Sequence, residues 1–326
     1  MSRRRVAALA LAPALLLGAC AAPLPVPEPD PAPLVVQPAM TADQADRVIA
    51  DFSRVLATAD GSTDTSALDS RLTGPALALR LNEYALRTSG LTEDVTAIPE
   101  AAQTVVVPAT DVWPRTLMAV TESPADLQAP LLLAFTQASP RDQFRLWAWV
   151  RLFPGVTTPQ FAQPDLGAAP VAPDSTTLAR SPETVMVGYL DLLTNGDASE
   201  YATAFLPDPL RDGIVGTRTA YTELVGDNGS LVETYNPAGD GLQSIGTFDG
   251  GAVVVGAFET VTTITLSDST LTLDGEIAAM LGRTTVETSL AFTWLSVVAF
   301  RVPPAGSTDP VEVLGAEHTL TSVTGE

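Results

Sequence analysis

The sequence contains no lysine, one cysteine and one histidine in 326 residues. A single cysteine excludes an intramolecular disulfide, a CxxC redox pair and a cysteine-ligated zinc or iron–sulfur site. A single histidine excludes a metal site made from several histidines, and we expect neither a metal nor a cofactor. All 17 basic residues are arginine, and 38 acidic residues outnumber them to give a net charge of −21. Because nucleic-acid binding depends on neutralising phosphates, this balance argues against a nucleic-acid partner.

No stretch of the sequence reaches the ~20 apolar residues needed to span a bilayer. An apolar stretch of 12 residues, residues 6–17, follows the three arginines at residues 3–5. This pattern predicts an export signal over residues 1–20. The n-region does not distinguish general secretion from twin-arginine export.

The end of this segment resembles the bacterial lipobox, in which small residues precede a cysteine that is diacylated and becomes the mature N-terminus. The residues that carry the resemblance are Leu17, Gly18, Ala19 and Cys20. The resemblance implies that Cys20 carries lipid, with palmitate as a typical acyl chain, at the outer face of the cell membrane. The alternative is an ordinary secretory signal with an incidental cysteine.

Residues 21–40 follow as a proline-rich segment, with seven prolines among residues 21–39. Such a composition favours an extended polyproline conformation. We predict a tether that holds the folded part away from the membrane. The whole chain is 46% apolar, so the remainder can bury real cores, and its length predicts about two domains.

Residues 41–153 are predicted to form a first α+β domain. Thr41 and Gln44 match a capping box, and apolar residues at helical spacing continue until Gly61. A second helix begins near Pro75, a favoured first-turn proline. Strands are predicted at residues 103–107, 115–122, 130–137 and 143–153. Residues 154–181 contain five prolines and are predicted to be a linker.

Residues 182–326 are predicted to form a second α+β domain. Ser181 and Pro182 match a helix N-terminus, and two further helical pieces extend to about Leu224. Strands are predicted at residues 231–235, 243–247, 252–265, 270–273, 286–302 and 311–321. Alternation places Phe292 and Trp294 on the buried face of one of them. Helices followed by antiparallel strands, seen twice, indicate an α+β fold with an internal duplication.

Two resemblances sharpen this expectation. Residues 189–198 (YLDLLTNGDA), followed by Tyr201 and Phe205, are similar to the opening of the nuclear transport factor 2-like fold. That likeness implies two helix-packed curved antiparallel sheets, or cones, in tandem. Several segments together with the lipobox resemble an actinobacterial lipoprotein family of unknown function: RLTGPA at 71–76, TVVVP at 104–108, WPR at 113–115, SPR at 139–141, RLFPG at 151–155, TVTTIT at 260–265 and LDGE at 273–276. This second likeness implies a Gram-positive envelope location and brings no catalytic residues with it.

One strand carries a candidate ligand-binding surface. Alternation over residues 144–152 places Arg145, Trp147, Trp149 and Arg151 on one face. Aromatic rings flanked by guanidinium groups suit a sugar ring or an anionic headgroup. The alternative is a central strand whose two tryptophans pack beneath the helices.

No catalytic residues are predicted. His318 is the only histidine that could act as a base, and no GxSxG nucleophile motif is present. We therefore expect a non-catalytic binding or scaffold lipoprotein that meets an unknown envelope protein or ligand. The alternative is an envelope hydrolase or isomerase that uses a cone-shaped pocket, an analogy made at the level of the fold.

Overall fold

The computed structural model describes residues 35–92, 95–123 and 128–326. Residues 36–326 form one compact unit. The predicted lipobox, with Leu17, Gly18, Ala19 and Cys20, lies outside the described residues, as does most of the predicted tether at residues 21–40. Within the described part of the chain, none of the helices combines the length and the hydropathy that crossing a membrane requires.

Two helices joined by a short 3-10 helix begin the unit: α1 (Ala42–Asp60), η1 (Thr65–Ser70) and α2 (Gly74–Thr88). The predicted capping box is confirmed, because the Thr41 hydroxyl accepts from the Gln44 backbone N–H and the Gln44 side chain accepts from the Thr41 N–H. α1 buries a stripe that includes Phe52, whose ring meets Phe135 edge-on at 5.3 Å. Pro75 lies in the first turn of α2, as expected.

Four strands follow as an antiparallel meander: β1 (Ala102–Val106), β2 (Arg115–Thr121), β3 (Leu131–Gln137) and β4 (Arg145–Leu152). Their bounds confirm the predicted strands to within two residues. Most residues of β3 and β4 are buried on both faces of the sheet, so these strands are near-continuous apolar runs.

The rest of the chain repeats the order of helices before strands. The helical elements are α3 (Pro182–Asn195), η2 (Gly196–Ala198), α4 (Pro209–Val225) and η3 (Gly226–Asn228). The long strands are β5 (Gly229–Gly246), β6 (Ala252–Leu266), β9 (Ser289–Val302) and β10 (Glu312–Gly325). Between β6 and β9 lie β7 (Leu271–Thr272), α5 (Gly275–Leu281) and β8 (Thr285–Val286), with β7 and β8 paired. Ser181 caps α3 by accepting from the Thr184 N–H, as predicted.

One expected pair of strands is a single strand in the structure. The sequence predicts separate strands at residues 231–235 and 243–247, but β5 runs through both. Its pairing with β6 shifts register between Ala238 and Gln243, where Gly239 and Gly241 adopt positive φ values. Glycine reaches this backbone region without steric cost, so the strand bulges there and continues.

Eight strands make one antiparallel sheet in the order β1-β2-β3-β4-β10-β9-β6-β5. Its two halves meet where β10 pairs with β4 through Gly315 opposite Leu152 and Ala316 opposite Arg151. A Cβ atom at Gly315 would lie 2.3 Å from the Arg151 carbonyl oxygen. The absence of a side chain at this residue therefore permits the junction.

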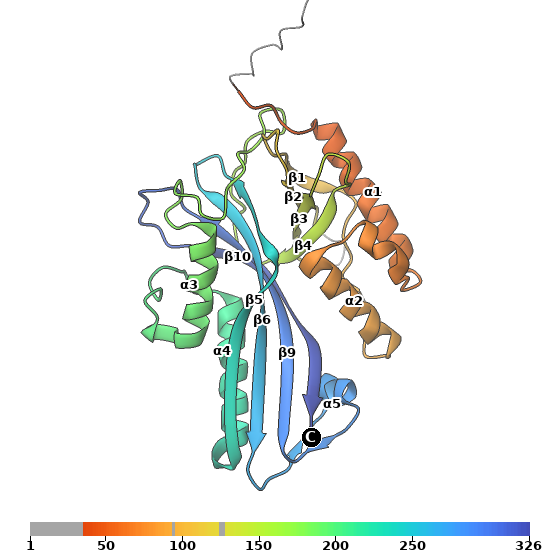
Figure 1. Ribbon diagram of the computed structural model, residues 1–326, viewed down its shortest axis with the longest axis vertical. Coiled ribbons are helices and arrows are strands. Elements are labelled where there is room, and N and C mark those ends of the chain that lie inside the picture. Colours follow the sequence, from red (N-terminus) through yellow and green to blue (C-terminus); the bar gives the residue numbers. More distant parts are fainter. Residues whose placement is uncertain (1–34, 93–94, 124–127) are drawn as a thin grey trace, which may run out of the picture. The chain divides into compact units, whose positions relative to one another are not determined.

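The long strands bury different residues on their two faces. Val253, Val255 and Val297 belong to the core shared with α1, α2 and β1–β4. Val254, Val298 and Phe300 belong to a second core beneath α3 and α4. Figure 1 shows α3 and α4 on one side of the long strands and α2 on the other. Each long strand thus has one face toward each group of helices.

The α+β prediction is confirmed as a mixed fold with a large antiparallel sheet and several helices. Strands from residues 41–153 and from residues 182–326 share that sheet, and part of the proline-rich segment between them lies along it, with Pro170 bridged to Ile245. The predicted division at residues 154–181 stays a prediction.

Candidate functional site

The face of β4 that the sequence singled out is covered by α2. Trp147 and Trp149 are only 2% and 1% exposed. A Cβ atom at Gly74, the first residue of α2, would lie 2.7 Å from the Trp147 indole nitrogen, so the helix begins directly on that ring. The pairing of β4 with β3 shifts register between Leu146 and Ala148, which interrupts the predicted alternation at Trp147. Arg145 and Arg151 are half-buried, and Arg151 donates to the Ala129 carbonyl at 3.1 Å. Ligand binding by these four residues stays a prediction, and both indole rings are enclosed.

Trp149 belongs to a group of buried and partly buried polar side chains that we call the Arg80 cluster: Asp60, Arg80, Glu83, Trp149 and Glu317. The fully buried Arg80 guanidinium lies 5.3 Å from the Trp149 ring centroid, 3.1 Å from a Glu83 oxygen and 3.4 Å from an Asp60 oxygen. Burial raises the pKa of Glu317 to about 7, against the opposing attraction of Arg151. Among the described residues, the Trp149 indole nitrogen and the Glu317 Oε1 have no hydrogen-bond partner. Sequence reasoning did not predict that Arg80 would be buried.

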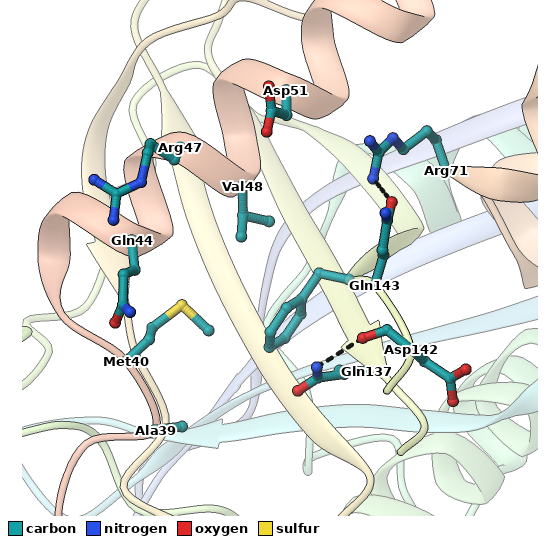
Figure 2. Close-up of a pocket in the computed structure, with 11 residues that line it drawn as sticks. Ala39, Met40, Gln44, Arg47, Val48, Asp51, Arg71, Gln137, Asp142 and Gln143 are labelled. Atoms are coloured by element: carbon teal, nitrogen blue, oxygen red, sulfur yellow. Dashed lines mark hydrogen bonds between the residues drawn. The ribbon is translucent and has the colours of Figure 1, made fainter. Parts of the chain in front are cut away.

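The first of two notable hollows, about 510 Å³, lies between the start of α1 and the turn that joins β3 to β4. Figure 2 shows Arg47 and Arg71 on opposite sides of it, with Gln137 and Gln143 along one wall. These amides are already engaged within the protein. Gln137 donates to the Asp142 carbonyl and accepts from the Trp113 indole, and Gln143 accepts from Arg71. The bonded polar groups of this wall therefore hold the β3–β4 turn together and join it to Trp113, which precedes β2, and to Arg71, which follows η1.

The second hollow is a groove of about 460 Å³ between α4 and strands β9 and β10, which we call the α4 groove. The residues that line it are Phe153, Pro209, Leu210, Gly213, Ile214, Thr217, Tyr221, Trp294, Ala316 and His318. None of these described lining residues is acidic, and none carries a lysine or arginine charge. The walls are thus apolar and aromatic, with the Thr217 hydroxyl, the Tyr221 hydroxyl and the His318 ring as polar side-chain groups.

The floor of the α4 groove is an aromatic pair. The Trp294 and His318 rings stack with centroids 4.6 Å apart and planes 6° apart. His318 lies directly opposite Ser296 in the pairing of β10 with β9, and its Nδ1 is 2.8 Å from the Ser296 hydroxyl oxygen. This hydrogen bond and the stacking fix the plane of the imidazole. The atoms packed around the ring lower the pKa of His318 to about 4 by desolvation, although the residue as a whole is exposed. The imidazole is therefore neutral at pH 7.

The roof of the groove is one face of α4. Leu210, Gly213, Ile214, Thr217 and Tyr221 recur at the three- and four-residue spacing of a helix face. A Cβ atom at Gly213 would meet nothing within 4 Å, so the missing side chain leaves room beneath the helix. Gly213 and Thr217, the two small residues of this face, leave part of the space between α4 and the strands β9 and β10 unfilled.

Residues of α4 and its N-cap that do not line the groove anchor the helix. Asp208 caps its N-terminus by accepting from the Arg211 N–H, and the same carboxylate accepts from the Tyr189 hydroxyl on α3 at 2.9 Å. Farther along, Arg218 donates to the Leu193 carbonyl and pairs with Glu233 of β5 at 3.4 Å. These contacts hold α4 without using the groove face.

A neutral imidazole can accept or donate one hydrogen bond through Nε2, depending on its tautomer. The groove can therefore hold an apolar or aromatic group and give it one directed polar contact. Ser296 is fully buried, so its hydroxyl orients the ring and does not face the groove as a nucleophile. Among the described residues, no group of three or more histidine, cysteine, aspartate or glutamate side chains is arranged to hold a metal.

Sequence reasoning singled out both Trp294 and His318 but did not predict that their rings would be in contact. Trp294 was expected on the buried face of its strand, and His318 was noted as the single histidine. The signal that joins them is the register of β9 with β10, which places His318 opposite Ser296 and Leu320 opposite Trp294. Alternation within each strand does not supply that register.

Residues 36–325 match a family described as a domain of unknown function, DUF8094. The chain belongs to the DUF8094 family. The match covers every residue of the α4 groove and of the Arg80 cluster. No curated protein and no solved structure gives a significant match to the chain.

Proposed function

We propose that this DUF8094 protein is a lipid-anchored, extracytoplasmic binding module of the cell envelope and that the α4 groove is its ligand site. The observation that carries the proposal is the lining of the groove, a hollow of about 460 Å³ with aromatic and aliphatic walls and a stacked Trp294–His318 floor. Ligand pockets are typically apolar hollows of this size with a few oriented polar groups. The Arg80 cluster is closed beneath α2 and offers no comparable opening.

The anchor is the second part of the proposal. The lipobox at Leu17, Gly18, Ala19 and Cys20 and the prolines that follow support it. An actinobacterial envelope origin is part of the same proposal. A tandem of cone-like domains related to nuclear transport factor 2 belongs to the proposal as well. The order of helices before strands in each half supports that relationship.

An envelope hydrolase or isomerase is the second candidate, and one observation favours it. The His318 imidazole lines the groove, is neutral at pH 7 and is held by a hydrogen bond to Ser296. A base of this kind normally works with an orienting acid or a reachable nucleophile. Ser296 is fully buried, and no carboxylate lines the described walls of the groove, so binding is the better supported function.

Native mass spectrometry of the protein extracted from its own membrane tests the ligand site. The full chain and two variants, Gly213→Leu and Gly216→Leu, are compared. Both glycines have open space at the Cβ position, but only Gly213 lines the groove. We expect a bound molecule on the full chain and on Gly216→Leu, and none on Gly213→Leu. A ligand that survives Gly213→Leu would place binding elsewhere, and turnover of envelope substrates that requires His318 would favour the enzyme.

The intact mass of the N-terminal peptide from the same preparation tests the anchor. We expect a diacylated Cys20 at the N-terminus and release of Cys20→Ala into the medium. Retention of that variant in the membrane would overturn the lipid anchor and leave the groove experiment unaffected.

A further inference from the structure

The α4 groove has aromatic walls and lies in the more acidic part of the chain. We propose that its ligand is a small organic cation, an ammonium group that carries alkyl substituents. This inference rests on the proposed function, because it names the ligand class of the same site.

Aromatic rings supply the attraction. Trp294, Tyr221 and Phe153 line the groove with the His318 ring. The faces of tryptophan, tyrosine and phenylalanine attract cations through their negative quadrupole, and a desolvated site strengthens that attraction. An alkylated ammonium suits such walls because its methyl groups also bury apolar surface against them.

The net charge of residues 182–326 favours the same ligand. Residues 182–326 contain 20 acidic residues and 4 arginines. Three of those arginines are already paired with carboxylates: Arg211 with Asp208, Arg218 with Glu233 and Arg301 with Asp249. Burial raises the pKa of the Tyr221 hydroxyl, and the nearby Asp274 carboxylate raises it further. An anion would meet this acidic field without a lining arginine to balance it, whereas a cation gains from it.

The His318 ring is compatible with a cation. Its pKa near 4 keeps it uncharged at pH 7, so it adds no repulsion to the floor of the groove. Stacking against Trp294 leaves the imidazole as a fourth aromatic surface. An arginine or lysine in the same place would have excluded a cationic ligand.

A matched pair of probes tests the inference on the detergent-solubilised full chain. Choline carries a trimethylammonium group, and 3,3-dimethylbutan-1-ol has the same shape with a carbon in place of the nitrogen. Isothermal titration calorimetry of both should show choline binding at least about tenfold more tightly, the ratio that corresponds to ~1.4 kcal/mol. Gly213→Leu should abolish choline binding, and Gly216→Leu should leave it unchanged.

A third variant, Trp294→Leu, keeps an apolar wall and removes the aromatic face. We expect it to weaken choline binding and to leave the binding of the alcohol largely unchanged, with the folded state checked by circular dichroism. Equal binding of the two probes, blocked by Gly213→Leu, would overturn the cation inference and leave the proposed binding groove in place. Absence of choline binding, or binding that Gly213→Leu does not affect, would also overturn the inference. The native mass spectrometry experiment decides the proposed function separately.

Discussion

Glu317 and His318 are neighbours on β10, yet they face opposite sides of the sheet and meet opposite surroundings. Glu317 belongs to the Arg80 cluster beneath α2, and His318 forms the floor of the α4 groove. Desolvation favours the neutral form of both side chains, so it raises the pKa of the carboxyl to about 7 and lowers that of the imidazole to about 4. One strand thus carries two residues whose charges are suppressed for the same reason.

The helix above each residue makes the difference. α2 presents the long polar side chains of Arg80 and Glu83 to the sheet, and these fill the space with ion pairs. α4 presents Gly213 and Thr217 and leaves a groove. The two faces of the same sheet thus carry a closed polar cluster or an open groove, depending on the size of the side chains that the packed helix turns toward the sheet.

Breaking the closed side should have the largest effect. Arg80→Ala removes a fully buried guanidinium from Glu83, Asp60 and the Trp149 ring. Removing one partner of a buried ion pair typically costs about 3–5 kcal/mol of unfolding free energy, because the remaining charge stays buried. Urea denaturation measures the change. Arg54→Ala, which breaks an exposed pair with Asp51, is the control and should leave the midpoint unchanged. A midpoint for Arg80→Ala equal to that of the parent would show that the cluster is not structural.

Glu317→Gln should stabilise the protein at neutral pH. The folded carboxyl has a pKa of about 7, against 4.5 as its ordinary value, so the folded state binds more protons between those pH values. Stability should therefore fall as pH rises from about 4.5 to 7, and Glu317→Gln should remove that fall and gain at least ~1 kcal/mol at pH 8. Denaturation midpoints across this range provide the measurement. Parallel pH profiles for the parent and the variant would contradict the buried carboxyl.

Gly213→Ala should stabilise α4 slightly. The added methyl group meets nothing within 4 Å, and alanine is favoured over glycine in a helix by about 0.5–1 kcal/mol. Gly216→Ala, also without neighbours at Cβ, is the matched control and should gain a similar amount. Thermal unfolding of the two variants measures both gains. A loss of stability confined to Gly213→Ala would mean that the groove is closed in solution.

His318→Gln should produce the smallest change, because His318 as a whole is exposed. The folded imidazole has a pKa of about 4, against 6.5 as its ordinary value. Stability should be lost as pH falls from about 6.5 to 4, since the unfolded state then binds the additional proton. Glutamine does not titrate, so its stability profile should lack this acid loss. An equal loss of stability at acid pH in the parent and in the variant would mean that other titrating groups cause it.

These two titrations oppose each other between about pH 4.5 and 6.5, where Glu317 favours lower pH and His318 favours higher pH. The parent protein should therefore show a flatter pH profile than either single variant. In the double variant Glu317→Gln, His318→Gln, we expect both of these pH-dependent changes in stability to disappear.

Much of the secondary structure could be predicted from local sequence. The capping box at Thr41, the first-turn proline at Pro75 and the N-cap at Ser181 each act within four residues, so they were readable directly. Apolar alternation likewise gave the strands around Trp294. The single strand β5 was missed because a glycine-rich bulge looks like a break when only its residues are seen.

The candidate site could be predicted from the sequence less well than the secondary structure. The pattern of Arg145, Trp147, Trp149 and Arg151 predicted one face of a regular strand, but the pairing of β4 with β3 shifts register between Leu146 and Ala148. The pattern also contains no information on what lies above the strand. α2 covers the two tryptophans, and the polar groups beneath it include Glu317, 168 residues from Trp149 in the chain. Nothing local to Arg80 distinguishes a buried arginine from a solvated one on an amphipathic helix.

The order of helices and strands, the acidic charge balance and the arginine-only basic residues follow from the amino-acid sequence, because composition and short-range spacing are properties of the chain alone. Tertiary structure decided which residues meet. The pairing of β10 with β4 at Gly315 joined the two halves of the sheet, and the register of β10 with β9 brought His318 to Ser296 and its ring onto Trp294. Register and helix crossing depend on contacts between distant segments, so a groove roofed by Gly213 and floored by His318 exists only in the folded chain.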